Sequence, residues 1–217
     1  MSPARKIIVF DIETASQPEA EIAHLIPQFN PPANYKDPEK IKAWFEKAKL
    51  DWLTDAALDP VSGRIEAIGL ATFHPEHGIQ YNIQLNEHGT LEDEADLLRD
   101  FWTMTVMKNT VEWVGFNCFG FDLPFMMRRS WKVGVMPPAN IRSGRYWGDQ
   151  FVDLLDLWQM GNRQTFISLD RLGKYLGLPG KAGDGQFFHK LERDQKIAYL
   201  EGDLKLTMNI AQRLLCQ

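Results

Sequence analysis

The sequence predicts an α/β protein with a mixed central sheet flanked by helices. The apolar run at residues 7–10 does not alternate with polar residues, which indicates a strand covered on both faces and therefore central in its sheet. Strand patterns at 64–73 and 79–85 are joined by a short turn and predict a hairpin beside that strand. A helical pattern at 92–107 then precedes an apolar strand at 111–116, so the helix is expected to be a crossover.

Length and composition predict one domain. The 217 residues are 44% hydrophobic and 12% aromatic, enough to bury a core, so we expect a single domain over 1–217 with an insertion at about 15–60. The two cysteines, Cys118 and Cys216, cannot form a disulfide framework, and the start of the chain does not resemble a signal peptide. No apolar stretch approaches the roughly 18 to 20 residues of a membrane span. A soluble, cytoplasmic protein is expected.

The charge of the chain does not decide its partners. A net charge of −5 argues against a long basic groove that follows many phosphates. Residues 125–149, however, contain a single acid and five basic side chains, which are Arg128, Arg129, Lys132, Arg142 and Arg145. Acids that hold divalent cations would also make the total more negative without repelling phosphate, because the ions reverse the local field.

The predicted insertion contains one clear helix. Asp37 followed by Pro38 is a helix-start signal, and apolar side chains at helical spacing follow it, which predicts a helix over 38–50. A short helix at 19–25 is a further option in this otherwise proline-rich segment. Its aromatic side chains are assigned to packing in preference to stacking on a ligand.

The second half of the chain is predicted to be mostly helical. Helices are expected over 121–131, over 168–176 with Ser168 as cap, and over 192–215, where two apolar stripes share the helix. Residues 151–158 fit either a short strand or an amphipathic turn. For Asp153 and its neighbour Asp156, helix capping is favoured over a position behind metal ligands.

Two carboxylates follow the first apolar run. Asp11 and Glu13 are two residues apart on a predicted strand, so their side chains leave the same face roughly 6 to 7 Å apart. Acids at the mouth of a hydrophobic core are unfavourable unless a metal or a hydrogen-bond network compensates them. A positive group is therefore expected beside them.

Two further acids complete a candidate set. Asp122 lies at a predicted helix start, either as an ordinary N-cap or as a carboxylate that points into a metal site. Tyr199 and Asp203 are four residues apart and share a helix face about 6 Å from one another, whereas Glu201 faces away. A ligand set made only of carboxylate oxygens suits Mg²⁺ or Mn²⁺ better than zinc.

Three motifs give the chain a family resemblance. FDIET at 10–14, NCFGFDLP at 117–124 and YLEGD at 199–203 resemble the three exonuclease motifs of the DEDD superfamily of 3′-to-5′ exonucleases. The tyrosine four residues before the last aspartate is similar to the tyrosine subclass, since the histidine of the other subclass would stand at Ala198. The second motif resembles the proofreading domains of family B DNA polymerases, and the chain as a whole resembles their predicted free-standing relatives.

The resemblance implies a ribonuclease H-like fold and a two-metal hydrolysis. The substrate would be the 3′ end of nucleic acid, with DNA and single-stranded or frayed ends favoured, and the products would be nucleoside 5′-monophosphates. Two Mg²⁺ or Mn²⁺ ions would activate water and stabilise the attacking and leaving oxygens. Asp11 would bridge both ions, Glu13 and Asp203 would complete the first, and Asp122 would serve the second through water. Tyr199 would orient the attacking water.

The resemblance also implies substrate contacts. The candidate substrate-binding residues are Thr14, Asn117, Phe121 and Arg128. Asn117 and Phe121 would hold the last nucleotides, although a core role is as well supported for Phe121. For Arg128, Arg129 and Lys132, a solvated helix face is favoured over a phosphate contact.

Other functions stay open. A catalytically silent or partner-dependent nucleic-acid-binding module of the same fold is the main alternative, and the presence of all four carboxylates argues against it. A ribonuclease H-type endonuclease is disfavoured by the spacing of Tyr199 and Asp203. The length leaves no room for a polymerase domain, so a polymerase fragment is not expected.

Overall fold

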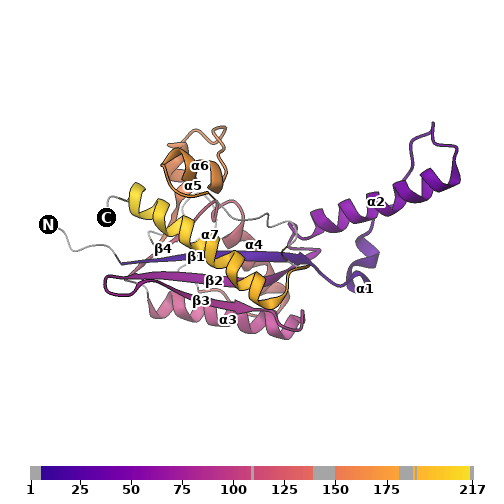
Figure 1. The fold of residues 1–217 in the computed structure, drawn as a ribbon. Helices are drawn as coiled ribbons and strands as arrows, with labels where there is room; N and C mark the ends of the chain where they lie inside the picture. The colour runs from indigo at the N-terminus through magenta and orange to yellow at the C-terminus, as the bar shows by residue number, and fades with distance from the viewer. Residues whose placement is uncertain (1–5, 109, 139–149, 181–187, 189, 216–217) are drawn as a thin grey trace. The chain divides into compact units, whose positions relative to one another are not determined.

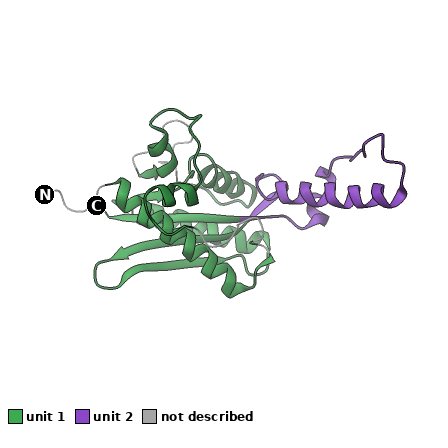
Figure 2. Cartoon of the chain, turned by 45° about the horizontal axis from the view of Figure 1, so that its top comes forward, with its two compact units in different colours: residues 1–13, 65–217 green, residues 14–64 purple. Residues whose placement is uncertain are grey.

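The computed structural model describes residues 6–108, 110–138, 150–180, 188 and 190–215. The chain forms two compact units, one made of residues 1–13 and 65–217 and the other of residues 14–64 (Figure 2). The expectation of a single functional domain with an insertion stays a prediction.

The larger unit is built on a five-stranded sheet in the order β3-β2-β1-β4-β5 (Figure 1). The strands are β1 (Ile7–Ser16), β2 (Gly63–His74), β3 (Gly78–Leu85), β4 (Glu112–Gly115) and β5 (Phe151–Asp153). β2 and β3 are antiparallel, whereas β4 runs parallel to both β1 and β5. The predicted mixed sheet with a central first strand is confirmed.

Two helices of the larger unit begin at a hydroxyl cap, and the cap at Ser168 is the predicted one. The helices are α3 (Leu91–Met107), α4 (Asp122–Lys132), α5 (Leu154–Gln159), α6 (Leu169–Tyr175) and α7 (Arg193–Leu214). Thr90 Oγ1 accepts a hydrogen bond from the Asp93 N–H at 3.1 Å and starts α3, and Ser168 Oγ accepts from the Arg171 N–H at 3.3 Å and starts α6. Each hydroxyl satisfies a backbone donor that has no partner inside its helix.

The alternation of side chains along β1 separates two hydrophobic cores. Ile8, Phe10 and Ile12 pack with side chains of α3 and α4. Ile7 and Val9 point to the other face and pack with side chains of α5, α6 and α7. In Figure 1, α7 crosses the strands over one face of the sheet. The strand is therefore buried on both faces, as its unbroken apolar run predicts.

The smaller unit contains α1 (Glu19–Ile22), the 3₁₀ helix η1 (Ala23–Leu25) and α2 (Pro38–Ala56). The Asp37 side chain accepts from the Glu39 N–H at 3.0 Å, which confirms the predicted helix start. α2 continues past the predicted end at residue 50 because the sequence has no Gly or Pro before Pro60 to stop it.

The ambiguous segment at 151–158 contains both alternatives in succession, β5 and then α5, with Asp153 at the junction. Cys118 is a buried free thiol. Arg142, Arg145 and Cys216 lie outside the described residues. Among the helices that the structure describes, none has the length and apolar character needed to cross a membrane.

Candidate active site

Three predicted carboxylates come together on one face of β1. The strand continues to Ser16, so Asp11 and Glu13 lie within it and not at its end. At odd positions they follow Ile7 and Val9 onto the face that α7 covers. Asp203 of α7 is buried there, and the carboxylates of Asp11, Glu13 and Asp203 each offer an oxygen within 4.8 Å of the others. Strand parity thus explains why acids far apart in the sequence meet.

Asp122 approaches the same strand from the start of α4. Its Oδ1 accepts a hydrogen bond at 3.2 Å from the N–H of Ile12, the residue between Asp11 and Glu13. Its side chain also hydrogen-bonds with that of Asp11. Phe121, not Asp122, occupies the N-cap position of α4, so the interpretation of Asp122 as an ordinary N-cap is wrong.

Burial dominates the electrostatics of Asp122. It raises the pKa of this carboxyl to about 7, and the nearby Asp153 charge adds to the rise. The backbone N–H groups of Asp122 and Ile12 and the hydrogen bond with Asp11 lower the pKa but do not cancel the effect of burial. Asp11, Glu13 and Asp203, with Asp122 beside them, form an all-oxygen donor set that fits a hard divalent cation such as Mg²⁺ or Mn²⁺.

Packing fixes the ring of Tyr199 one helical turn before Asp203. The side chain is buried, and its ring lies edge-on to that of Phe188 at 5.7 Å between centroids. Lys196 Nζ lies 5.8 Å from the Phe188 ring centre and donates to Glu66 Oε1 at 2.7 Å. These contacts tie the first turn of α7 to β2, and the catalytic role of Tyr199 stays a prediction.

The second motif forms a tight loop between β4 and α4. Asn117 is half-buried and has the left-handed φ of 57°, which is uncommon for a residue other than glycine. A Cβ at Gly120 would lie 2.5 Å from Asn117 Oδ1, so a larger residue there would displace the Asn117 side chain. Phe121 is half-buried and packs on Phe125 at 5.4 Å between ring centroids. Its packing supports the core role, and stacking on a nucleotide stays a prediction.

The remaining predicted contact residues lie in different environments. Thr14 is half-buried on β1 and belongs to the smaller unit, and Arg128 and Lys132 are exposed on α4. Arg129 corrects the prediction of a solvated helix face, because its side chain is only 1% exposed and pairs with buried Glu94. Its Nε lies 2.8 Å from Glu94 Oε1 and its Nη2 lies 2.7 Å from Glu94 Oε2. It cannot contact a phosphate in this state.

A second group of potential metal ligands lies at the turn between β2 and β3. His74, Glu76 and His77 are all exposed, and each offers a ligand atom within 4.8 Å of the others. His74 Nδ1 already accepts from the Glu76 N–H at 3.2 Å, and the two imidazole rings are stacked 4.6 Å apart. Of these two groups, found among the residues that the structure describes, the one on β1 and α7 is partly buried and has an all-oxygen donor set.

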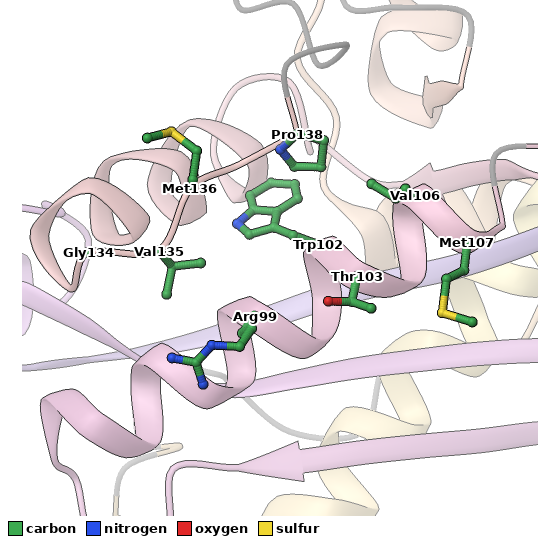
Figure 3. Close-up of a pocket in the computed structure, with 9 residues that line it drawn as sticks. All are labelled: Arg99, Trp102, Thr103, Val106, Met107, Gly134, Val135, Met136 and Pro138. Carbon is green, nitrogen blue, oxygen red and sulfur yellow. The ribbon is translucent and has the colours of Figure 1, made fainter.

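A hollow of about 430 Å³ between α3 and the segment after α4 is separate from these acids (Figure 3). It is lined by Arg99, Trp102, Thr103, Val106, Met107, Gly134, Val135, Met136 and Pro138. None of the predicted site residues is among them. Trp102 Nε1 donates to Ser130 Oγ at 2.8 Å and joins α3 to α4 beneath it.

Comparison with protein families gives the site its context. A family model described as a predicted 3′-5′ exonuclease related to the exonuclease domain of PolB matches residues 60–203, which are 144 of the 217 residues. The chain belongs to this family. The matched part contains Asn117, Asp122 and Asp203, but it begins after β1. The structure therefore adds Asp11 and Glu13, which β1 brings to Asp203 of the matched part.

Among solved structures, the chain is similar to the family B DNA polymerase from the hyperthermophilic archaeon Pyrobaculum calidifontis. The TM-score is 0.64 at 18% sequence identity, and the match covers 98% of this chain and 25% of the polymerase chain. At this identity the similarity shows the fold, and the predicted ribonuclease H-like exonuclease fold is confirmed. A comparison with curated proteins found no match.

Proposed function

We propose that this protein is a metal-dependent 3′-to-5′ exonuclease of the tyrosine subclass, which hydrolyses terminal phosphodiester bonds and releases nucleoside 5′-monophosphates. The observation that carries the proposal is the grouping of Asp11, Glu13 and Asp203, with Asp122 bound to the backbone between the first two. Membership in a predicted exonuclease family supports it independently.

The four acids would hold two divalent cations, Mg²⁺ or Mn²⁺. When bound, such ions stabilise charge on the attacking and leaving oxygens and make a bound water more acidic. Asp11 would contact both ions, because it lies in the Asp11–Glu13–Asp203 group and also hydrogen-bonds with Asp122. The buried Tyr199 would orient the attacking water through its hydroxyl.

The substrate would be the 3′ end of DNA in preference to RNA, single-stranded or frayed. The support for DNA is the shared fold of the family B DNA polymerase and the resemblance of the second motif to proofreading domains. Asn117 and Phe121 would hold the terminal nucleotides, and Thr14 and Arg128 are the other candidate substrate contacts. We retain a single exonuclease domain over 1–217 and a cytoplasmic location as parts of the proposal.

The first experiment incubates 5′-labelled single-stranded DNA and RNA of one sequence with the protein in Mg²⁺, Mn²⁺ or EDTA. We expect a metal-dependent ladder that shortens from the 3′ end, faster for DNA, and absent with Asp11→Ala. The absence of cleavage with either metal on either substrate would contradict the proposal and would favour a silent or partner-dependent nucleic-acid-binding module.

A matched pair of substitutions on α7 tests the assignment of the acids. Asp203→Asn is expected to lower kcat about a thousandfold, which corresponds to about 4 kcal/mol of transition-state stabilisation. Glu201→Gln is the control, since Glu201 is two residues away on the same helix and outside the acid group. Its kcat should stay within about twofold of the wild type. Equal losses in both variants would show that general helix disturbance is the cause.

A further inference from the structure

Asp153 lies at the end of the sheet where the second motif follows β4. It is the last residue of β5 and pairs in register with Gly115, the last residue of β4. Because the carboxyl ends of parallel neighbours meet at one edge, Asp153 lies beside the start of residues 116–121, here called the β4–α4 loop. Its side chain is only 4% exposed, so its charge requires partners within the protein.

Backbone N–H groups are those partners. Oδ1 of Asp153 accepts from the N–H of Asn117 at 2.8 Å and from that of Leu155 at 2.9 Å. Oδ2 accepts from the N–H of Phe119 at 2.9 Å. The Asn117 and Phe119 donors belong to the β4–α4 loop, more than thirty residues earlier in the chain. Hydrogen bonds to an ionised acceptor are roughly twice as strong as neutral ones.

The loop is a tight turn around Asn117. The N–H groups of Gly120 and Phe121 both donate to the Asn117 carbonyl, at 3.0 and 2.9 Å, so the chain turns tightly around that residue. Asn117 has a left-handed φ, which asparagine adopts more readily than most residues other than glycine. The two bonds from Asp153 support this conformation and leave neither the Asn117 nor the Phe119 N–H unsatisfied.

The loop positions two residues of the candidate site, Asn117 and Asp122. Asn117 is its second residue, and the loop ends directly before Asp122, whose Oδ1 accepts a hydrogen bond from the Ile12 N–H. A displacement of the loop therefore moves both side chains relative to β1, and about 1 Å of misplacement in a catalytic group can cost a hundredfold in rate.

We propose that Asp153 is a positioning residue of the active site, which holds the β4–α4 loop so that Asn117 and Asp122 face the substrate and the cations. This inference rests on the proposed exonuclease function. Asp153 acts through the loop amides and does not itself contact the substrate.

A capping role is the simpler explanation, since Asp153 also caps α5 through the Leu155 N–H. Two variants separate the two roles. Asp153→Ser retains a good helix cap but has one short hydroxyl in place of two oxygens, so it cannot hold both loop amides. Asp153→Asn retains the size and Oδ1, but it turns an NH₂ group toward the N–H of Phe119.

The matched control is Asp156→Asn, the same change three residues later at an exposed position of α5. For each variant we would measure kcat on 5′-labelled single-stranded DNA, the Mg²⁺ concentration for half-maximal rate, and amide hydrogen exchange. We expect both Asp153 variants to lose about 10- to 100-fold in kcat or in apparent Mg²⁺ affinity, as is usual for groups that orient metal ligands. Exchange should accelerate at residues 116–121 while α5 stays protected in Asp153→Ser.

The outcomes separate this inference from the proposed function. If the wild type cleaves DNA and both Asp153 variants match Asp156→Asn, the positioning role is wrong. If α5 loses protection in Asp153→Ser and the loop does not, Asp153 is only a cap. If the wild type cleaves no substrate, the exonuclease proposal fails by itself, and unchanged exchange at Asn117 and Phe119 would still overturn the claim that Asp153 holds the loop.

Discussion

The larger unit holds acids in two different environments, one fully buried on α3 and one partly buried between β1 and α7. Glu94 of α3 meets the guanidinium of Arg129 through two hydrogen bonds and also accepts the Ile65 N–H at 2.9 Å. In the group on β1 and α7, the carboxylates of Asp11, Glu13 and Asp203 approach within 4.8 Å of one another. Glu94 is paired with an opposite charge, whereas the second group brings like charges close together.

This difference separates structure from function. The buried ion pair links α3 to α4, and removal of one partner leaves an uncompensated charge. Like charges held close together raise the free energy of the folded chain. Unfavourable arrangements of this kind are expected where a ligand is to be bound. Substitutions in the first group should therefore affect stability, and those in the second should affect activity.

The largest stability effect is expected from Arg129→Met. Glu94 would remain buried without its partner, which should lower the free energy of unfolding by about 3 to 5 kcal/mol. Urea denaturation would measure it, with Arg128→Met as the matched control at the exposed neighbouring position, where a change below about 0.5 kcal/mol is expected. The kcat of the folded Arg129→Met fraction should equal that of the wild type.

A double variant tests whether the unpaired Glu94 carboxylate causes the loss of stability in Arg129→Met. Glu94→Gln added to Arg129→Met removes the charge and keeps an oxygen that can accept the Ile65 N–H. Much of the lost stability should return. If the double variant is no more stable than Arg129→Met alone, lost packing and not the charge explains the effect.

A smaller effect is expected when cations bind the acid group. At a free Mg²⁺ or Mn²⁺ concentration of 100 times the dissociation constant, binding should stabilise the wild type by about 2.7 kcal/mol. Thermal unfolding with and without metal would measure the shift. Asp11→Asn should abolish it without destabilising the metal-free protein, because one like charge is removed from the cluster. The same metal-induced shift in Asp11→Asn would contradict the assignment of this group as the binding site.

Local patterns in the sequence predicted the parts of the site that depend on periodicity. Successive side chains of a strand point to opposite faces, which predicts that Asp11 and Glu13 share a face. Helical spacing places Tyr199 one turn before Asp203. The cap signals at Asp37 and Ser168 are likewise local, and the structure confirms them.

Long-range partners could not be predicted in this way. Arg129 and Arg128 have the same local context, and only the position of Glu94, 35 residues earlier on a packed neighbouring helix, makes one buried and the other exposed. Asp153 appears in a segment too short for a secondary-structure period, and its main partners lie 34 and 36 residues earlier. The sheet register that joins them arises only from tertiary packing.

The smallest loss of stability is expected from Thr90→Ala, which tests whether a lost hydrogen bond matters as much as a buried unpaired charge. Thr90→Ala removes the N-cap of α3, the helix that carries Glu94, and should cost about 1 kcal/mol. The loss is smaller than for Arg129→Met because the freed Asp93 N–H is at an exposed position and can bond to water, whereas Glu94 is fully buried. Thr90→Ser keeps the hydroxyl and should retain the stability in urea. If Thr90→Ala destabilised the protein as much as Arg129→Met, the helix start rather than the buried charge would govern the stability of the α3–α4 layer.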